Sequence, residues 1–527
     1  MSLLDCVVIG SGHAGVACTK GLIDQGLRPT VIDVGYDGVA DRLPVFAELA
    51  QHEPEDWPEE LKEAARGYFP INLRGVPLKP VYGSFFPYAI NDSDLSVTLE
   101  GAETVQSLAR GGLSNTWGSS ILPYRQQDIG GWPIRIADLE PHYRSVLSFM
   151  PITGEHDDLE AMFPLFSDAA YPMPHTVQIE ALVSHLRRHR GELEQAGLVF
   201  GASRLAVVAD PEDPEHCRHC GLCMHGCPFG SIYNTTSTLQ TLAQQGAIDY
   251  RSGIYVDHLR EIDDLVDVDY HFRGDTQRGG KLQAKRVFVA CGAVSSTRLI
   301  LQSLTAERSA HILDSQTFLA PMLTRRHSPV STESQGNTLA QLFLEVLDDE
   351  VASHGIHLQI YGYSDIMLKA LLSRSPIRRT TAERLLQPVI GRLVAVQGFL
   401  HSDDSPGLRL ELTASGVRLV GDEAPKPRAR VRALMRKLGH LHRELGARPV
   451  AGLTQVGPPA KSFHYGGSLP MREHPRGLES DVLGRPCGAS RIHVVDSSVF
   501  PSIAGTTIAF TAMANAHRIA TEVGHLH

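Results

Sequence analysis

The chain has 527 residues, more than one hydrophobic core usually sustains, so we expect at least two lobes. Hydrophobic residues make up 42% of it and charged residues 20%, a globular composition that argues against a fibrous or disordered protein. The net charge of −10 disfavours nucleic acid as a partner, because phosphate binding needs a concentrated basic face.

The start of the chain carries no targeting signal that we can identify. No apolar run approaches the length that spans a bilayer, and the first residues pass directly into a strand pattern. We therefore expect no integral membrane segment and a cytoplasmic location. Because cytoplasmic thiols stay reduced, the eight cysteines do not predict a disulfide framework.

The N-terminal segment predicts a βαβ unit, with a strand at Cys6–Ile9, a helix at Val16–Gln25 and a second strand at Pro29–Val34. Between the first strand and the helix lies the motif G-x-G-x-x-G, whose glycines are Gly10, Gly12 and Gly15. In this context the motif indicates a dinucleotide site. The first glycine permits a tight turn, the second lets a pyrophosphate approach the backbone, and the third lets the helix pack on the strand.

Asp33 stands at the end of the second predicted strand. An acidic residue at this place in a dinucleotide fold accepts a hydrogen bond from the adenosine ribose. We expect Asp33 to do the same. The motif alone does not distinguish FAD from NAD.

A cysteine cluster follows, with the spacing C-x2-C-x2-C-x3-C and Pro228 directly after it. Its members are Cys217, Cys220, Cys223 and Cys227. Bacterial ferredoxin iron–sulfur loops have this spacing, but there the fourth cysteine serves a second cluster. A distant fourth ligand would have to come from the remaining cysteines, which are Cys6, Cys18, Cys291 and Cys487. We expect a metal-free loop, reduced or closed by disulfides, with a four-iron cluster and a zinc ion as the alternatives.

Two later segments have the pattern of nucleotide-binding folds. Arg286–Ile300 contains the apolar strand VFVACG followed by a small-residue turn and a helix, and Ile492–Ala520 runs strand, turn and long helix. Signatures at the start, middle and end predict an α/β fold with a discontinuous Rossmann-type domain. We assign it residues 1–45, 95–130, 225–310 and 455–527.

The insertions between these segments predict a substrate-binding lobe. It comprises residues 46–94, 131–224 and 311–454 and includes the cysteine loop 217–228. Within Leu313–Val420, the stretches LAQLFLEVLDD, IHLQIYGY and LRLELTASGVRL predict strands of a mainly antiparallel sheet.

Four segments resemble the glucose-methanol-choline (GMC) family of FAD-dependent oxidoreductases. HVVDSSVFPSIAGTTIAFTAMANAHRIA, at His493–Ala520, resembles the closing signature of the family, and FHYGGSLPM, at Phe463–Met471, resembles its active-site histidine turn. VFVACGAVSSTRLILQS is similar to an internal strand and helix of the FAD domain. ARGGLSNTWGSS, at Ala109–Ser120, resembles the loop over the flavin, most closely in pyranose oxidases. The resemblance implies FAD rather than NAD.

The resemblance also implies roles for single residues. His464 corresponds to the base that acts on the substrate hydroxyl, and imidazole suits this task because its pKa lies near neutrality. Asp496 falls where an aspartate reaches the flavin ribityl chain, with helix capping as the alternative. Backbone groups of the flavin loop would face the flavin or its pyrophosphate, at Gly112, Ser114, Asn115 and Thr116.

The sequence departs from the family pattern at two positions. Thr507 stands where a second histidine or an asparagine is usual, and its hydroxyl can bond the substrate oxygen but cannot act as a second base. Thr116 stands where pyranose oxidases carry a histidine bonded to FAD. We therefore expect FAD to be bound non-covalently.

The expected function is oxidation of a CH–OH group on a sugar-like or other polyhydroxylated small molecule. His464 would take the hydroxyl proton while a hydride passes to flavin N5. The electrons would then leave to oxygen or to a redox partner, and an iron–sulfur cluster would favour the partner. Two alternatives are a flavin-dependent isomerase or mutase, in which the hydride returns to the same molecule, and a flavo-iron–sulfur electron-transfer module.

Overall fold

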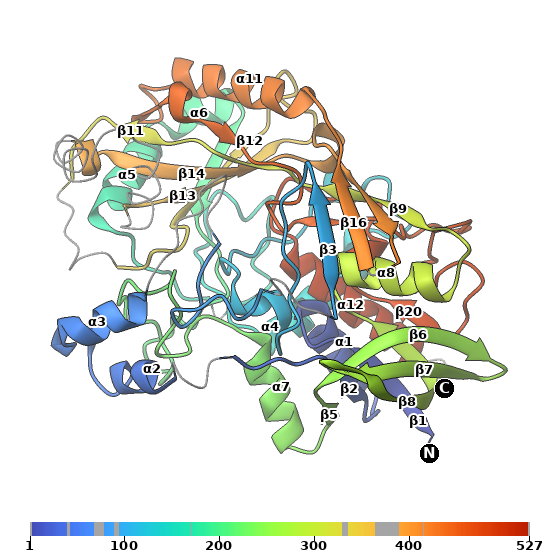
Figure 1. Cartoon of the computed structure of the whole chain (residues 1–527). Helices are drawn as coiled ribbons and strands as arrows, with labels where there is room; N and C mark the ends of the chain where they lie inside the picture. The colour runs from blue at the N-terminus through green and yellow to red at the C-terminus, as the bar shows by residue number, and fades with distance from the viewer. Residues whose placement is uncertain are drawn as a thin grey trace.

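The computed structural model describes most of the chain, namely residues 3–38, 43–67, 78–88, 94–168, 170–328, 336–363, 389–414 and 416–524. The described strands form three sheets with helices around them. The first sheet lies at the lower right of Figure 1 and the second at the upper left. This mixed α/β architecture agrees with the expected fold class.

The first sheet has seven strands and is mostly parallel. In spatial order they are β5 (Asp249–Arg251), β2 (Thr30–Ile32), β1 (Leu4–Ile9), β8 (Asp275–Val289), β7 (Leu265–Phe272) and β6 (Ile254–Ile262), with β20 (Ile492–Val494) also on β8. The first half of β8 pairs with β7 in antiparallel fashion, whereas its end runs parallel between β1 and β20. Segments from the start, middle and end of the chain therefore meet in one sheet.

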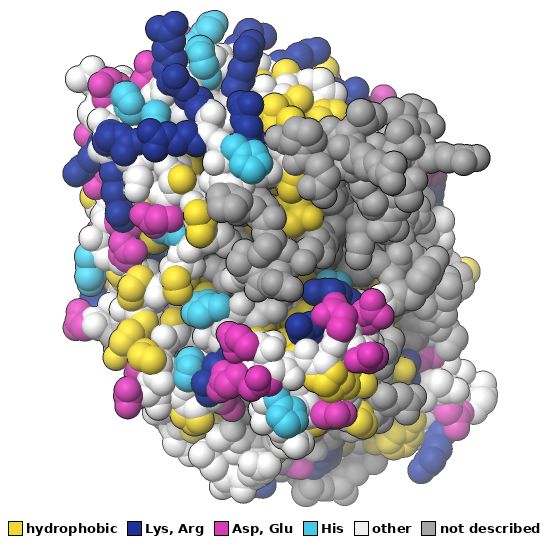
Figure 2. Space-filling view, turned by 90° about the vertical axis from the view of Figure 1, so that its left-hand side faces the viewer, with side chains coloured by type: hydrophobic (Ala, Val, Ile, Leu, Met, Phe, Trp, Pro, Cys, Tyr) yellow, Lys and Arg dark blue, Asp and Glu magenta, His cyan; other side chains and the backbone are white. Residues whose placement is uncertain are grey.

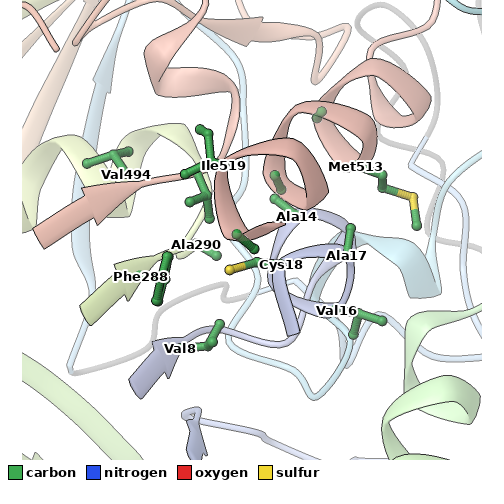
Figure 3. Close-up of a cluster of buried hydrophobic side chains, with 14 of the residues drawn as sticks. Val8, Ala14, Val16, Ala17, Cys18, Phe288, Ala290, Val494, Met513 and Ile519 are labelled. Carbon is green, nitrogen blue, oxygen red and sulfur yellow. The ribbon is translucent and has the colours of Figure 1, made fainter. Parts of the chain in front are cut away.

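Helices α1 (His13–Asp24) and α12 (Ala509–Gly524) pack on this sheet and on each other (Figure 3). Small side chains on α1, including Ala14, Ala17 and Cys18, allow the close approach. A Cβ on Gly21 would lie 2.8 Å from the carbonyl oxygen of His517 on α12, so a larger residue there would force the helices apart. The α1–α12 contact thus fixes the glycine turn, which comes directly before α1.

The second sheet has eight strands and is antiparallel at every described pairing. In spatial order they are β17 (Ala447–Pro449), β11 (Met322–Thr324), β14 (Leu393–Phe399), β13 (Ile356–Tyr361), β12 (Leu342–Val346) and β4 (Leu198–Ala202), with β10 (Thr317–Leu319) on β14 and β18 (Gln455–Val456) on β10. Its apolar face packs with side chains of α5 (Val177–Arg188) and α11 (Lys426–His440) in a second core.

A third sheet of five strands contains the last of the stretches that were predicted as strands, LRLELTASGVRL. In spatial order they are β19 (Tyr465–Gly466), β9 (Ser309–Asp314), β15 (Leu408–Leu412), β16 (Gly416–Gly421) and β3 (Ser96–Glu100). The stretch LRLELTASGVRL forms the β15–β16 hairpin here and does not join β12, β13 and β14. The antiparallel region expected within Leu313–Val420 is therefore divided between two sheets, and the expected domain boundaries stay a prediction.

The remaining described helices surround the sheets. They are α2 (Leu43–Leu49), α3 (Glu59–Arg66), α4 (Ile136–Leu147), α6 (Arg190–Gln195), α7 (Thr235–Gln244) and α8 (Ala293–Ser303). Short 3-10 helices are η1 (Pro54–Asp56), η2 (Gly112–Asn115), η3 (Gln126–Ile129), η4 (Ser402–Asp404), η5 (Ala451–Leu453) and η6 (Ser497–Val499). Within the described ranges, no helix is long and apolar enough to cross a membrane.

The surface carries charges of both signs. On the face in Figure 2, Lys and Arg side chains gather at the top of the molecule, and Asp and Glu side chains lie mostly lower down. The described side chains of this face therefore do not form one continuous basic surface.

Candidate active site

A cavity of about 910 Å³ lies where the first and second sheets meet the turn around His464. Its walls include the glycine turn after β1, the loop 106–120, parts of β13 and β14, and the start of α12. Ligand pockets usually have volumes of roughly 300–1,000 Å³, so this cavity is near the upper end and can hold more than a small substrate.

The glycine turn forms one end of the cavity. A Cβ on Gly10 would lie 2.5 Å from the carbonyl oxygen of Ala290, and one on Gly15 would lie 2.1 Å from the carbonyl oxygen of Gly10, so only glycine fits at either place. In front of Gly12, by contrast, a Cβ would meet nothing closer than 3.9 Å. Gly12 therefore leaves the backbone open to a ligand at the N-terminus of α1.

Asp33 lies directly after β2 and lines the same end of the cavity. Its carboxylate accepts a hydrogen bond from the Ser11 hydroxyl, within the glycine turn. Burial raises the pKa of Asp33 to about 6. The structure thus brings the predicted ribose ligand and the predicted phosphate turn together.

The loop resembling the flavin loop lies against this turn. A Cβ on Gly112, whose φ is +55°, would be 3.5 Å from Cα of Gly12, and both Gly112 and Thr116 line the cavity. Ser114 and Asn115 do not line it: the Ser114 hydroxyl lies 2.8 Å from that of Thr235, and the Asn115 amide donates to Gly112 O at 2.7 Å. These two side chains hold the loop in shape.

Asp496 lies at the cavity wall but its carboxylate is already engaged by the protein. One oxygen accepts hydrogen bonds from Gly292 N at 2.9 Å and from the Ser296 hydroxyl at 2.5 Å. The other accepts from the backbone N–H and the hydroxyl of Ser498, so Asp496 is the N-cap of η6. A carboxylate offers about four acceptor positions, and these four bonds use them. Asp496 thereby ties the end of β20 to α8 and also caps a short helix.

His464 faces the cavity from the turn before β19. Its ring stacks on Phe399 of β14, with the ring centroids 4.6 Å apart and an interplanar angle of 18°. Burial, followed by the influence of His357, lowers the pKa of His464 to about 4, and the backbone of Thr506 offsets this only in part. The imidazole is therefore neutral at neutral pH. Its Nδ1 has no hydrogen-bond partner of normal geometry among the described residues.

The conformation of this turn depends on a buried aspartate that the sequence did not suggest. Asp314, at the end of β9, accepts hydrogen bonds from Ala460 N at 3.0 Å and from the Ser462 hydroxyl at 3.1 Å. The Ser462 hydroxyl in turn accepts from His464 N at 2.9 Å. Burial raises the pKa of Asp314 to about 7. Asp314 therefore positions His464 through Ser462.

Thr507 also lines the cavity, but its hydroxyl bonds to the backbone of Leu122. It accepts a hydrogen bond from Leu122 N at 2.7 Å and donates to Leu122 O at 3.4 Å. The side chain is 3% exposed. The hydroxyl thus holds the segment around Leu122 to the start of α12, and its donor is occupied.

A polar wall on the second sheet completes the cavity. Gln359 and Tyr361 of β13 and Gln397 of β14 line it, and Gln359 lies directly across from Gln397 in the strand pairing. The Tyr361 hydroxyl donates to Gln359 Oε1 at 2.7 Å, and the Gln397 amide donates to the Thr317 hydroxyl at 3.3 Å. We call Gln359, Tyr361 and Gln397 the polar wall.

The polar wall was not predicted from the sequence, although the sequence contains a signal for it. In IHLQIYGY, Ile356, Leu358 and Ile360 pack in the second core, and the residues between them turn to the opposite face. Polar residues at every second position of an otherwise apolar strand indicate a face that meets a ligand or water. This pattern identifies a ligand-facing surface only when the structure shows the other walls of the cavity.

The four cysteines of the loop lie together beside this cavity. All four line one small hollow, which shares the side chain of Leu339 with the large cavity. All eight cysteines of the chain are free, so no disulfide closes the loop.

No family model and no curated protein sequence matches the chain. Among solved structures, the chain is similar to pyridoxine 4-oxidase from Mesorbium loti, with a TM-score of 0.62 over 99% of this chain and 100% of that chain. The two sequences are 14% identical, so the likeness shows the fold. The expected fold class is confirmed by it.

Proposed function

We propose that the protein is an FAD-dependent oxidoreductase that oxidises a CH–OH group of a polyhydroxylated small molecule, with His464 as the base. The observation that carries the proposal is that one cavity joins the glycine turn, a neutral histidine and the polar wall. The fold that the chain shares with an oxidase supports the same class of chemistry.

The residues at the glycine turn fit FAD. The open space in front of Gly12 and the N-terminus of α1 suit a pyrophosphate, and the Asp33 carboxylate beside Ser11 suits a ribose hydroxyl. Gly112 and Thr116 would lie along the isoalloxazine side. Thr116 offers no nitrogen for a covalent bond to the ring, so FAD would be held non-covalently.

Bound FAD supplies the hydride acceptor for this reaction. The chain supplies the base: neutral His464 takes the hydroxyl proton, and the alkoxide so formed releases its hydride more readily. Stacking on Phe399 and the Asp314–Ser462 bonds fix the orientation of the imidazole. The substrate loses one proton and one hydride and becomes an aldehyde or ketone.

The polar wall supports a substrate with several hydroxyl groups. A side-chain amide both donates and accepts hydrogen bonds, as a hydroxyl does, so Gln359 and Gln397 can bond neighbouring hydroxyls of one molecule. Both glutamines already bond to neighbouring side chains, but each amide keeps a further donor and acceptor position that a second substrate hydroxyl can use. Sugar-like molecules are therefore the substrate class that we propose.

The test is anaerobic reduction of the bound flavin. The purified protein would be mixed without oxygen with monosaccharides and cyclic polyols, and in parallel with pyridoxine and simple alcohols. We expect loss of the yellow colour with at least one polyol and formation of its carbonyl product. Turnover of a polyol to an isomer without loss of colour would identify an isomerase, and bleaching by pyridoxine alone would contradict the polyol assignment.

The mode of FAD binding is tested on the same protein. Acid precipitation should release the flavin into the supernatant, because Thr116 cannot form the covalent bond. Colour that stays in the washed pellet would contradict non-covalent binding.

A further inference from the structure

The cysteine loop brings all four of its thiols to one place. Cys217, Cys220, Cys223 and Cys227 line a single hollow, although in a ferredoxin loop the fourth cysteine turns away to another cluster. Positive φ angles at His219, Gly221 and Gly226, of 53°, 74° and 122°, let the short loop coil around this hollow. No distant ligand is needed to complete a set of four.

The other cysteines have places elsewhere in the fold. Cys18 of α1 is packed in the core of the first sheet (Figure 3), and Cys6 lies in the same core. Cys291 lines the large cavity near Gly10, and the exposed Cys487 donates to Pro475 O. None of them lines the hollow.

The spacing of the thiols fits a cluster better than a single ion. A tetrahedral zinc ion with Zn–S bonds of about 2.3 Å holds its sulfurs within about 4 Å of one another. Among the described residues, no three cysteine sulfurs lie within 4.8 Å of one another. In a four-iron cluster each thiolate binds a different iron atom, so the sulfurs stand further apart.

A buried cation next to the loop has no anionic partner in the described part of the chain. Lys79 is 7% exposed and donates to Trp117 O at 3.3 Å, and it forms no ion pair with any described residue. Burial lowers the pKa of Lys79, and the nearby thiols of Cys223 and Cys227 oppose this shift. A buried charge is unfavourable unless it is compensated. A cluster with four thiolate ligands carries negative charge and would compensate it.

A buried hydroxyl in the hollow also has no partner. Ser231 is 1% exposed and lines the hollow, and its side-chain oxygen makes no hydrogen bond with any described residue. A thiolate or a bridging sulfide would accept this bond, and hydrogen bonds to the sulfurs are common in protein clusters. The remaining lining side chains are mostly apolar, such as Met173, Val207 and Ile232.

The loop is covered by α2 side chains on one side and adjoins the large cavity on another. Phe46 and Leu49 of α2 pack with Cys220 and Phe229, and the Trp57 ring stacks on Phe229 at 5.9 Å. Figure 1 shows α2 and α3 at one side of the molecule. On the cavity side, Leu339 belongs to the walls of both the hollow and the large cavity.

We propose that Cys217, Cys220, Cys223 and Cys227 bind one [4Fe–4S] cluster, which carries electrons singly from the large cavity to a one-electron acceptor. This proposal differs from the metal-free loop expected from the sequence, and the electron-carrying role rests on the proposed function. Oxidation of one CH–OH group releases two electrons. The cluster accepts one at a time, so each substrate molecule reduces two molecules of a one-electron acceptor such as ferricyanide.

The site is tested first by its composition. The whole protein, purified without oxygen and reconstituted with ferrous iron and sulfide, should contain about four iron atoms and four labile sulfides per chain and give an EPR signal after dithionite reduction. Less than one iron per chain, or one tightly held zinc, would overturn the proposal. This result does not depend on substrate, so it is separate from the test of the proposed function.

Variants then locate the cluster. Cys220→Ser should lose most of the iron and sulfide, whereas the matched control Cys487→Ser should keep both, since Cys487 lies outside the hollow. Lys79→Met should keep the iron but shift the reduction potential of the EPR signal to more negative values, because the positive charge that favours the reduced cluster is gone. If Cys487→Ser loses the cluster and Cys220→Ser keeps it, the assignment is wrong.

The electron route is tested in wild-type protein with a bleaching substrate. Under anaerobic conditions, the substrate alone should generate the EPR signal of the reduced cluster. Bleached flavin with a loaded cluster that stays oxidised would refute the relay while leaving the proposed oxidation intact.

Discussion

Replacement of Thr507 by valine should reduce stability and leave catalysis nearly unchanged. The hydroxyl accepts from Leu122 N at 2.7 Å in a buried setting, so Thr507→Val leaves a backbone donor without a partner. Such a loss costs about 1–3 kcal/mol of unfolding free energy. Because the donor of the hydroxyl is occupied by Leu122 O, we expect the rate of flavin reduction to change by less than about threefold.

The assay combines thermal or urea unfolding with anaerobic stopped-flow reduction of the flavin. Thr507→Ser serves as the matched control, because serine keeps the hydroxyl and should restore most of the stability. A large fall in the rate of Thr507→Val at unchanged stability would refute this account. The hydroxyl would then contact the substrate, as the resemblance to the GMC family first implied.

Three other predictions follow from the site. Burial raises the pKa of Asp314 from 3.8 to about 7. The contribution of this group to the free energy of unfolding is therefore fully present below its ordinary pKa and is lost as the pH rises through about 7. In unfolding experiments Asp314→Asn should therefore be more stable than wild type at pH 8, by at most about 4 kcal/mol, because asparagine carries no charge. At pH 4 the variant should gain no stability, and an equal change at both pH values would contradict this prediction. Gln397→Leu should raise the polyol concentration for half-maximal flavin reduction about tenfold with little change in the limiting rate, and a fall in the limiting rate alone would argue against a binding role. Because the pKa of His464 is lowered to about 4, flavin reduction should stay constant from pH 8 to about pH 5 and decline only below that; a decline already near pH 6.5 would contradict it.

The parts of the fold that sequence predicts well are those with local physical causes. The glycine turn follows from backbone geometry within a few residues: Gly10 and Gly15 have no room for a Cβ, and Gly12 faces open space. The apolar strands at the start, middle and end of the chain also predict a parallel sheet, because such strands are stable only when both faces are covered.

The parts that sequence does not predict depend on contacts between distant segments. Nothing near Asp314 in the chain indicates that it bonds Ser462, which is 148 positions away. The resemblance suggested a substrate contact for Thr507, but the structure engages its hydroxyl with Leu122, 385 positions away. Likewise, the cysteine spacing alone leaves open where the fourth thiol points, and only the fold brings Cys227 to the same hollow as the other three.

The most direct test of the central claim compares anaerobic flavin reduction by a bleaching polyol in wild type and in His464→Ala. General-base catalysis contributes about 10²- to 10⁴-fold, so the variant should reduce its flavin more slowly by that factor while keeping bound FAD. Raising the pH should restore part of the rate, because the substrate alkoxide then forms without the base. A rate within tenfold of wild type, with FAD retained, would contradict the assignment of His464 as the base.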